Sequence, residues 1–207
     1  IIFKKMDLGR IISLKSSPKK DEAVLINHRC ELFHLNLKSQ KLHLIDKSTF
    51  GDMGGLNWSP DGKWIVYDYP ITERLRAIKL CTIKTFKTQT ITRPTLEDFR
   101  PSFDPEGKYI YFLSKRTYVP YYDDLQFEMG FPRGTKPYLI LLDETLPSPF
   151  IPQVKESADK PKKEGKEKPK DIKIDLKGIE DRILEFPVEE GNYSRIDGIP
   201  GKALYIA

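Results

Sequence analysis

The side chains that could perform nucleophilic catalysis or bind a metal are few in this chain and poorly placed for either task. The only histidines are His28, His34 and His43. His34 and His43 could face each other across a hairpin, but no Asp/Glu cluster completes a metal site. No serine lies in a GxSxG turn or beside a histidine, as Ser-His catalysis requires. We expect strand-surface histidines, no catalytic residues, no metal and no cofactor.

The remaining reactive groups favour structural roles. The paired acids Asp123-Asp124 and Glu189-Glu190 are adjacent in the chain, whereas a calcium-binding loop needs acids at alternate positions. We expect them to be solvated loop charges. Cys30 and Cys81 lack CxxC or Cys/His spacing, which favours buried free thiols in a reducing compartment over a disulfide.

Six residues are the best candidates for contacts with a ligand, and the four charged ones flank predicted strands and could line one face of the fold. They are Asp52, Asp98, Arg100, Arg116, Tyr121 and Tyr122. For the four charged residues, caps of the local structure are the alternative. The two tyrosines belong to a long aromatic segment, 115–136, and such segments serve binding or packing. Its rings either cover the edge of a sheet or a neighbouring domain, or line a ligand channel.

A phrase of ten residues that occurs twice predicts the elements that position these candidates. Trp58–Tyr67 reads WSPDGKWIVY, and Phe103–Phe112, 45 residues later, reads FDPEGKYIYF. Self-similarity at this period is typical of the blades of a β-propeller. The Asp61-Gly62 pair predicts a tight turn, and the following apolar run predicts a strand covered on both faces. A degenerate copy of the phrase lies at 16–26, and a last copy of its apolar strand alone is predicted at Lys202–Ile206.

We therefore predict an all-β fold of propeller blades, each an antiparallel four-stranded unit of the TolB or WD40-like kind, in an incomplete ring. Stacked repeats bury their apolar faces only against neighbours. The chain is thus expected to belong to a longer polypeptide or to associate with a partner. The predicted division is a degenerate blade at 1–50, a blade at 51–96, a blade with the aromatic segment at 97–154, a disordered Lys/Glu/Pro-rich insertion at 155–173, and the remainder of that blade with the start of the next at 174–207.

Composition excludes several other classes of function. The 207 residues are 39% hydrophobic and carry a net charge of +5. Much of that charge lies in Lys155–Lys173, which holds eight Lys and five acids but neither Arg nor aromatic residues. Such a tract lacks the Arg side chains that bind phosphates in pairs of hydrogen bonds and the aromatic rings on which bases stack. No apolar run reaches the roughly 18 residues of a membrane span. We expect neither nucleic acid nor membrane as a partner.

The motifs that follow the second phrase resemble the second propeller of the tricorn protease family. The phrase alone is shared with TolB-like and prolyl-oligopeptidase propellers, whereas the order of the later motifs is more specific. The resemblance is carried by Arg100–Arg116, Tyr122 to Phe131, Lys136–Leu142, Pro147–Pro152, Ile174–Ile183, Phe186–Val188 and Gly191–Tyr193.

The resemblance implies part of a large, homo-oligomeric, cytoplasmic serine peptidase that degrades short peptides downstream of the proteasome or a similar protease. The family's catalytic motifs would lie outside this chain, which would serve as substrate channel, size filter and scaffold. Its expected partners are peptides and other domains or subunits of the parent protein. Two alternatives stay open: a stand-alone propeller for protein interactions, and the propeller of a prolyl-oligopeptidase-type hydrolase, whose catalytic domain would carry GxSxG.

Overall fold

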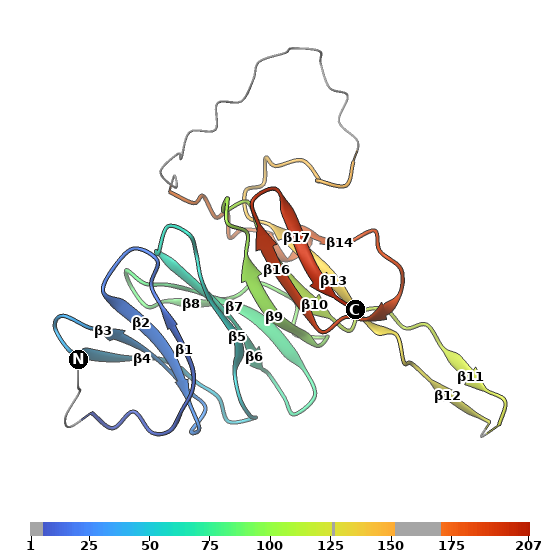
Figure 1. The fold of residues 1–207 in the computed structure, drawn as a ribbon, viewed down its shortest axis with the longest axis horizontal. Helices are drawn as coiled ribbons and strands as arrows, with labels where there is room; N and C mark the ends of the chain where they lie inside the picture. Colours follow the sequence, from blue (N-terminus) through green and yellow to red (C-terminus); the bar gives the residue numbers. More distant parts are fainter. Residues whose placement is uncertain (1–5, 126, 152–170) are drawn as a thin grey trace, which may run out of the picture.

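Strands make up about half of the described residues, and they form separate, mainly antiparallel sheets (Figure 1). The computed structural model describes residues 6–125, 127–151 and 171–207. Blade 1 contains β1 (Ile11–Ser16), β2 (Glu22–Asn27), β3 (Glu31–Asn36) and β4 (Lys41–Lys47), paired in chain order. Blade 2 repeats this order with β5 (Gly54–Trp58), β6 (Trp64–Pro70), β7 (Arg76–Thr82) and β8 (Thr88–Thr90).

Blade 3 has the same layout but carries additions along the chain. It contains β9 (Asp98–Phe103), β10 (Tyr109–Ser114), β13 (Gly134–Leu141) and β14 (Ile183–Glu185), and β15 (Gly191–Asn192) pairs in parallel with β13. Between β10 and β13 lies a hairpin of β11 (Tyr121–Asp123) and β12 (Glu128–Gly130), and the 3₁₀-helix η1 (Ile179–Asp181) precedes β14. A further antiparallel pair, β16 (Arg195–Ile199) and β17 (Lys202–Ile206), follows. The predicted fold class, four-stranded blades in an incomplete ring, is confirmed for the described residues.

The blades stack face to face, which explains why their central strands are apolar on both sides. In β6, Ile65 and Val66 are both fully buried. Because successive side chains of a strand point to opposite faces, Ile65 packs in the core between blades 1 and 2, and Val66 in the core between blades 2 and 3. Each such burial stabilises the fold by roughly 1.5–3 kcal/mol.

The repeated phrase forms the turn between the first two strands of a blade. Ser59 Oγ donates to Asp61 Oδ1 at 2.6 Å and accepts the N–H of Trp64 at 2.9 Å. Gly62 adopts a φ of 70°, which glycine tolerates without a steric penalty. In the second copy, Asp104 replaces Ser59 and accepts the N–H of Lys108 at 3.1 Å. The turn is thus specified by residues within the phrase itself.

The first strand of each unit lies on the inside of the array. We call β1, β5, β9 and β16 the inner strands. In Figure 1 they lie side by side, and β5 contacts both β1 and β9, while β9 contacts β16. The outer strands, such as β4 and β8, form the opposite edges of their sheets. The inner strands therefore form a continuous surface to which all units contribute.

The structure corrects the expected surface position of one histidine and the expected burial of one thiol. His34 is only 6% exposed, because it is packed between blades 1 and 2 against Phe86, with ring centroids 5.1 Å apart. Its partner across the hairpin is His43, as the sequence suggested. Cys81 is buried, but Cys30 is only half-buried, since it lies in the turn after β2. Both thiols are free.

The end of the predicted disordered insertion, 155–173, is ordered on the surface of blades 2 and 3. Asp171 pairs with Lys63 at 2.6 Å, and the N–H of Ile172 donates to Asp61 Oδ2 at 3.0 Å. The Ile172 side chain packs against the core between blades 2 and 3. An apolar side chain therefore anchors 171–173 to the blades, and residues 155–170 of the predicted insertion lie outside the described residues.

Candidate functional site

The inner strands line an open depression of about 330 Å³, which we call the inner cavity. Ten residues line it, and they come from all four inner strands. The charged members are Lys15 of β1, Arg100 of β9, and Arg195 and Asp197 of β16, and Ser13 and Asn57 add neutral polar groups. A surface to which each unit contributes one strand is the part of this fold best suited to contact a ligand along its length.

Arg100 is held at the cavity by an unusual backbone and by the preceding blade. Its φ is 53°, a left-handed conformation that costs a non-glycine residue free energy. The Arg100 N–H donates to Asp68 Oδ2 at 2.9 Å, and Asp68 Oδ1 accepts Arg76 Nε at 3.0 Å. The guanidinium of Arg100 also donates to the carbonyl of Ser194. Blades 2 and 3 and the residue before β16 therefore fix Arg100 together.

A glycine allows the inner strands of blades 2 and 3 to approach closely. Gly55 has a φ of 57°, and a Cβ built on it would lie only 2.2 Å from Pro101 Cδ. Any other residue here would clash with the next blade and strain its own backbone. Gly55 and Pro101 both line the inner cavity, so this close contact shapes its wall.

Asp98 and Arg116 form an ion pair within blade 3. Asp98 is fully buried, and its two carboxylate oxygens accept Arg116 Nε at 3.2 Å and Nη2 at 2.8 Å. Ser114 Oγ donates a third hydrogen bond at 2.5 Å. The guanidinium carbon of Arg116 also lies 5.4 Å from the centre of the Tyr138 ring. The buried Asp98 carboxylate is thus satisfied by hydrogen bonds within blade 3, and neither Asp98 nor Arg116 is among the residues that line the inner cavity.

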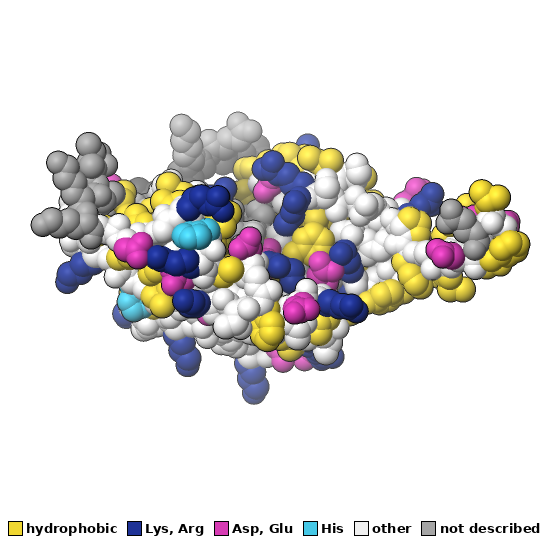
Figure 2. Space-filling model, turned by 90° about the horizontal axis from the view of Figure 1, so that it is seen from below, with side chains coloured by type: hydrophobic (Ala, Val, Ile, Leu, Met, Phe, Trp, Pro, Cys, Tyr) yellow, Lys and Arg dark blue, Asp and Glu magenta, His cyan; other side chains and the backbone are white. Residues whose placement is uncertain are grey.

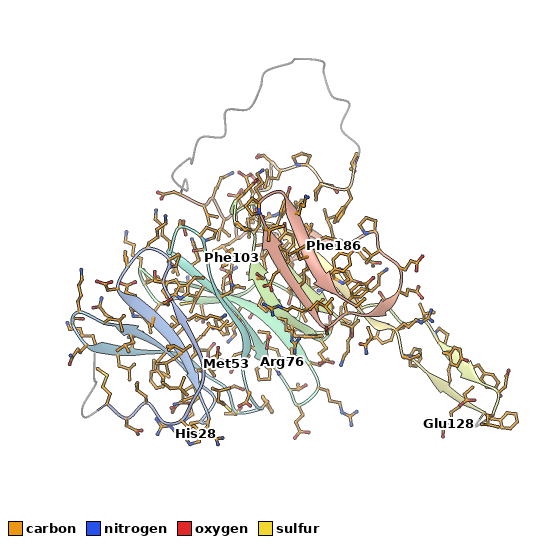
Figure 3. The ribbon with its side chains drawn as sticks, viewed as in Figure 1. His28, Met53, Arg76, Phe103, Glu128 and Phe186 are labelled. Atoms are coloured by element: carbon orange, nitrogen blue, oxygen red, sulfur yellow. The ribbon has the colours of Figure 1, made fainter. Side chains whose placement is uncertain are left out.

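Asp52 lies at the junction of blades 1 and 2. Its carbonyl accepts Arg76 Nη2 at 2.7 Å, and its Oδ1 accepts Cys30 Sγ–H at 3.3 Å. Burial and the Asp52 carboxylate raise the pKa of the Cys30 thiol above its ordinary value, which keeps it protonated near neutral pH. Figure 3 shows Arg76 beside Met53 at the lower edge of the blades. Asp52 thus joins two turns and is absent from the cavity lining.

Tyr121 and Tyr122 lie on the β11–β12 hairpin, which projects away from the blades (Figure 1). They are 65% and 52% exposed, so they do not cover a sheet edge. Figure 2, seen from below, shows this projection as largely hydrophobic, while Lys, Arg, Asp and Glu are intermixed over the blade ends. In Figure 3, Glu128 of the hairpin lies far from Arg76 and Met53. We call 118–131 the aromatic arm; its exposed apolar residues are Tyr118, Val119, Tyr121, Tyr122, Leu125, Phe127, Met129 and Phe131.

The six sequence candidates therefore occupy four separate places, and only Arg100 lines the inner cavity. Lys15 and Arg195 were not predicted from the sequence. Both lie in inner strands of the units that begin and end the described array, where no complete copy of the repeated phrase follows the strand. Their place in the sequence could have identified them, because the strand that precedes the proline of each turn faces the centre of a blade array. Among the described residues no three His, Cys, Asp or Glu side chains are grouped as a metal ion would need.

Stacked four-stranded blades whose first strands share one inner surface are the architecture of a β-propeller. The sequence matches the family described as the tricorn protease second beta propeller domain over residues 2–207. It is 34% identical over 203 residues to tricorn protease homolog 1 of Streptomyces coelicolor, covering 96% of this chain and 19% of that protein. It is 36% identical over 200 residues to the tricorn protease homolog of Saccharolobus solfataricus, covering 97% and 18% respectively.

A solved structure shows the same fold. The crystal structure of the tricorn protease matches with a TM-score of 0.79 at 22% identity, covering 94% of this chain and 19% of that chain. The chain belongs to the tricorn protease family, as its second β-propeller domain, and the resemblance seen in the sequence is confirmed. It spans about a fifth of the length of the curated relatives. None of the helical segments in the described residues has the length and apolarity to cross a membrane.

Proposed function

We propose that this chain forms part of the wall of a peptide channel in a larger, cytoplasmic serine peptidase, and has no catalytic role itself. The observation that carries the proposal is the inner cavity, to which all four inner strands contribute. A rigid wall of this kind admits an extended peptide and excludes a folded domain, which requires no catalytic residue in the wall. The parent peptidase would receive short peptides from an upstream protease and assemble as a homo-oligomer.

Rigidity of the wall supports this role. The inner strands are fixed by cross-blade contacts: Trp58 Nε1 donates to the carbonyl of Lys15 at 3.0 Å, and the N–H of Phe103 donates to Asn57 Oδ1 at 3.2 Å. These bonds join β1 to β5 and β5 to β9. A wall held in this way keeps its aperture constant, as filtering by size requires.

The test is photo-crosslinking in the parent polypeptide. A benzophenone amino acid is placed either at Ser13, on the inner cavity, or at Gln89, which is exposed on the outer strand β8. We expect an unstructured peptide of about ten residues to be captured from position 13 and not from position 89. A small folded domain should be captured from neither. Equal capture from both positions, or none from position 13, contradicts the proposal.

The aromatic arm supports a second, scaffolding role toward another domain of the parent protein. Leu125 and Phe127 at its tip are 85% and 76% exposed, and among the described strands β11 and β12 pair only with each other. An isolated two-stranded hairpin is marginally stable in water, and exposed apolar patches of this kind mark contacts with other protein surfaces. In the intact parent, hydrogen exchange of 118–131 should be slow, and Leu125→Ser with Phe127→Ser should accelerate it. Rapid exchange of the arm in the unmodified parent contradicts the scaffolding role.

A further inference from the structure

The charged groups that line the inner cavity are mostly cations. Lys15, Arg100 and Arg195 face a single acid, Asp197. Arg195 Nε and Asp197 Oδ2 lie 2.6 Å apart, so these two charges compensate each other. Lys15 is exposed and has no ion-pair partner among the described residues, and Arg100 donates its side-chain hydrogen bond to a neutral carbonyl. Within the described part of the chain, two positive charges on the wall are therefore left without an ion-pair partner.

The nearby acids cannot supply those counter-charges, because the fold already uses them. Asp68 binds Arg76, and Asp98 binds Arg116 through both of its oxygens. Both carboxylates are buried, at 2% and 0% exposure. Buried carboxylates are paired inside the blades, while Lys15 and Arg100 remain on the cavity side. The separation of paired acids from unpaired cations makes the wall electropositive.

We propose that the inner cavity binds carboxylate groups of extended peptides, either the C-terminal carboxylate or the side chains of Asp and Glu. This inference rests on the proposed channel function and adds a preference to it. A guanidinium and an ammonium on one wall offer charge-assisted hydrogen bonds to carboxylate oxygens. A concave surface with an excess of positive charge also raises the local concentration of negatively charged ligands, with an effect that salt weakens.

Three fluorescent peptides of equal length separate the two sources of carboxylate. The first has Asp and Glu side chains and a free C-terminus, the second has Asn and Gln with a free C-terminus, and the third has Asn and Gln with an amidated C-terminus. Binding to the parent polypeptide is followed by fluorescence anisotropy at low salt. We expect the first peptide, the second, or both to bind about fivefold to tenfold more tightly than the third.

Charge-removing variants assign the preference to the wall. Lys15→Gln removes an exposed cation from the cavity, and Lys41→Gln removes an exposed one from the outer strand β4. We expect Lys15→Gln to weaken binding of the carboxylate-bearing peptide about threefold to fivefold and to leave the third peptide unchanged, whereas Lys41→Gln changes neither. Arg195→Gln exposes Asp197 and should weaken binding further.

The outcomes that refute this inference differ from those that refute the channel. If the three peptides bind equally, or if Lys15→Gln and Arg195→Gln change nothing, the carboxylate preference is wrong, while capture from position 13 still supports a channel. If no peptide is captured from position 13, the channel itself is wrong, and the preference falls with it. Preferential binding that Lys41→Gln reduces as much as Lys15→Gln reflects overall charge and also refutes the inference.

Discussion

Replacing Asp68 with alanine should loosen the junction between blades 2 and 3. Asp68 is 2% exposed and joins two blades: its carboxylate binds Arg76 within blade 2 and accepts the backbone N–H of Arg100 in β9. Removing one partner of a buried ion pair costs about 3–5 kcal/mol. The Arg76 side chain is 25% exposed and keeps its hydrogen bond to the carbonyl of Asp52, so hydration offsets part of that loss. We expect the lower end, about 3 kcal/mol.

The effect should be local, and hydrogen exchange in the parent polypeptide can measure it. A loss of about 3 kcal/mol in the free energy of local opening lowers amide protection roughly a hundredfold. We expect this change in peptides that cover β9, because Asp68 holds the left-handed backbone of Arg100. Asp68→Asn keeps an acceptor for the Arg100 N–H but loses the charge, so its effect should be intermediate.

A matched control separates this junction from general charge effects. Asp21 pairs with Lys38 at 3.2 Å, and both side chains are largely exposed, at 62% and 81%. Exposed pairs contribute little, so Asp21→Ala should leave exchange throughout the blades unchanged. If protection of β9 in Asp68→Ala falls less than threefold, the carboxylate does not hold the two blades together. The assignment of Arg100's position to Asp68 would then be wrong.

Three further predictions test the packing of the blades. Gly55→Ala should lower the free energy of unfolding by more than about 3 kcal/mol in thermal or chemical denaturation, because the added Cβ would clash with Pro101 and the backbone of β9. As a control, Gly201→Ala should cost only about 1 kcal/mol, because there is open space around Gly201. Burial lowers the pKa of His34 below its ordinary 6.5, so the unfolded state binds a proton more readily than the folded state and the free energy of unfolding should fall as the pH drops below 6.5. His34→Gln should reduce this pH dependence in thermal melts recorded between pH 7.5 and 5. Burial raises the pKa of Cys81 to about 12, so iodoacetamide at pH 8 should modify Cys81 only after unfolding, and labelling of the folded protein should be confined to the half-buried Cys30.

The parts of the fold that depend on short-range interactions could be predicted from the sequence. The turn of the repeated phrase is held by bonds among Ser59, Asp61 and Trp64, all within six residues, so a local pattern was enough. The predicted last strand, Lys202–Ile206, agrees with β17 in both bounds. Its pairing with β16 is also local, since the two strands are joined by a tight turn at Gly201.

The candidate site could be predicted only in part, because it depends on contacts between blades. Asp98 begins β9 and Arg116 follows the end of β10, and the register of β9 against β10 brings them together inside one blade. Nothing in the spacing of 18 residues distinguishes such a pair from two free charges on a surface. Arg100 lies only two residues after Asp98, but it lines the inner cavity and has a left-handed φ, whereas Asp98 is buried inside the blade. Burial, and not residue type, separates these roles.

The pairing of buried carboxylates also accounts for the positive charge of the inner cavity. A carboxylate that enters a stacked-blade interior must be paired there, because an unpaired buried charge is costly. Asp68 and Asp98 meet this condition by pairing with Arg76 and Arg116 inside the blades, so four charges cancel away from the cavity. Lys15 lies on the exposed inner edge, where water solvates it and no partner is required. The positive character of the wall therefore follows from how the blades satisfy their buried acids, and substitutions at Asp68 or Asp98 should alter stability before they alter ligand binding.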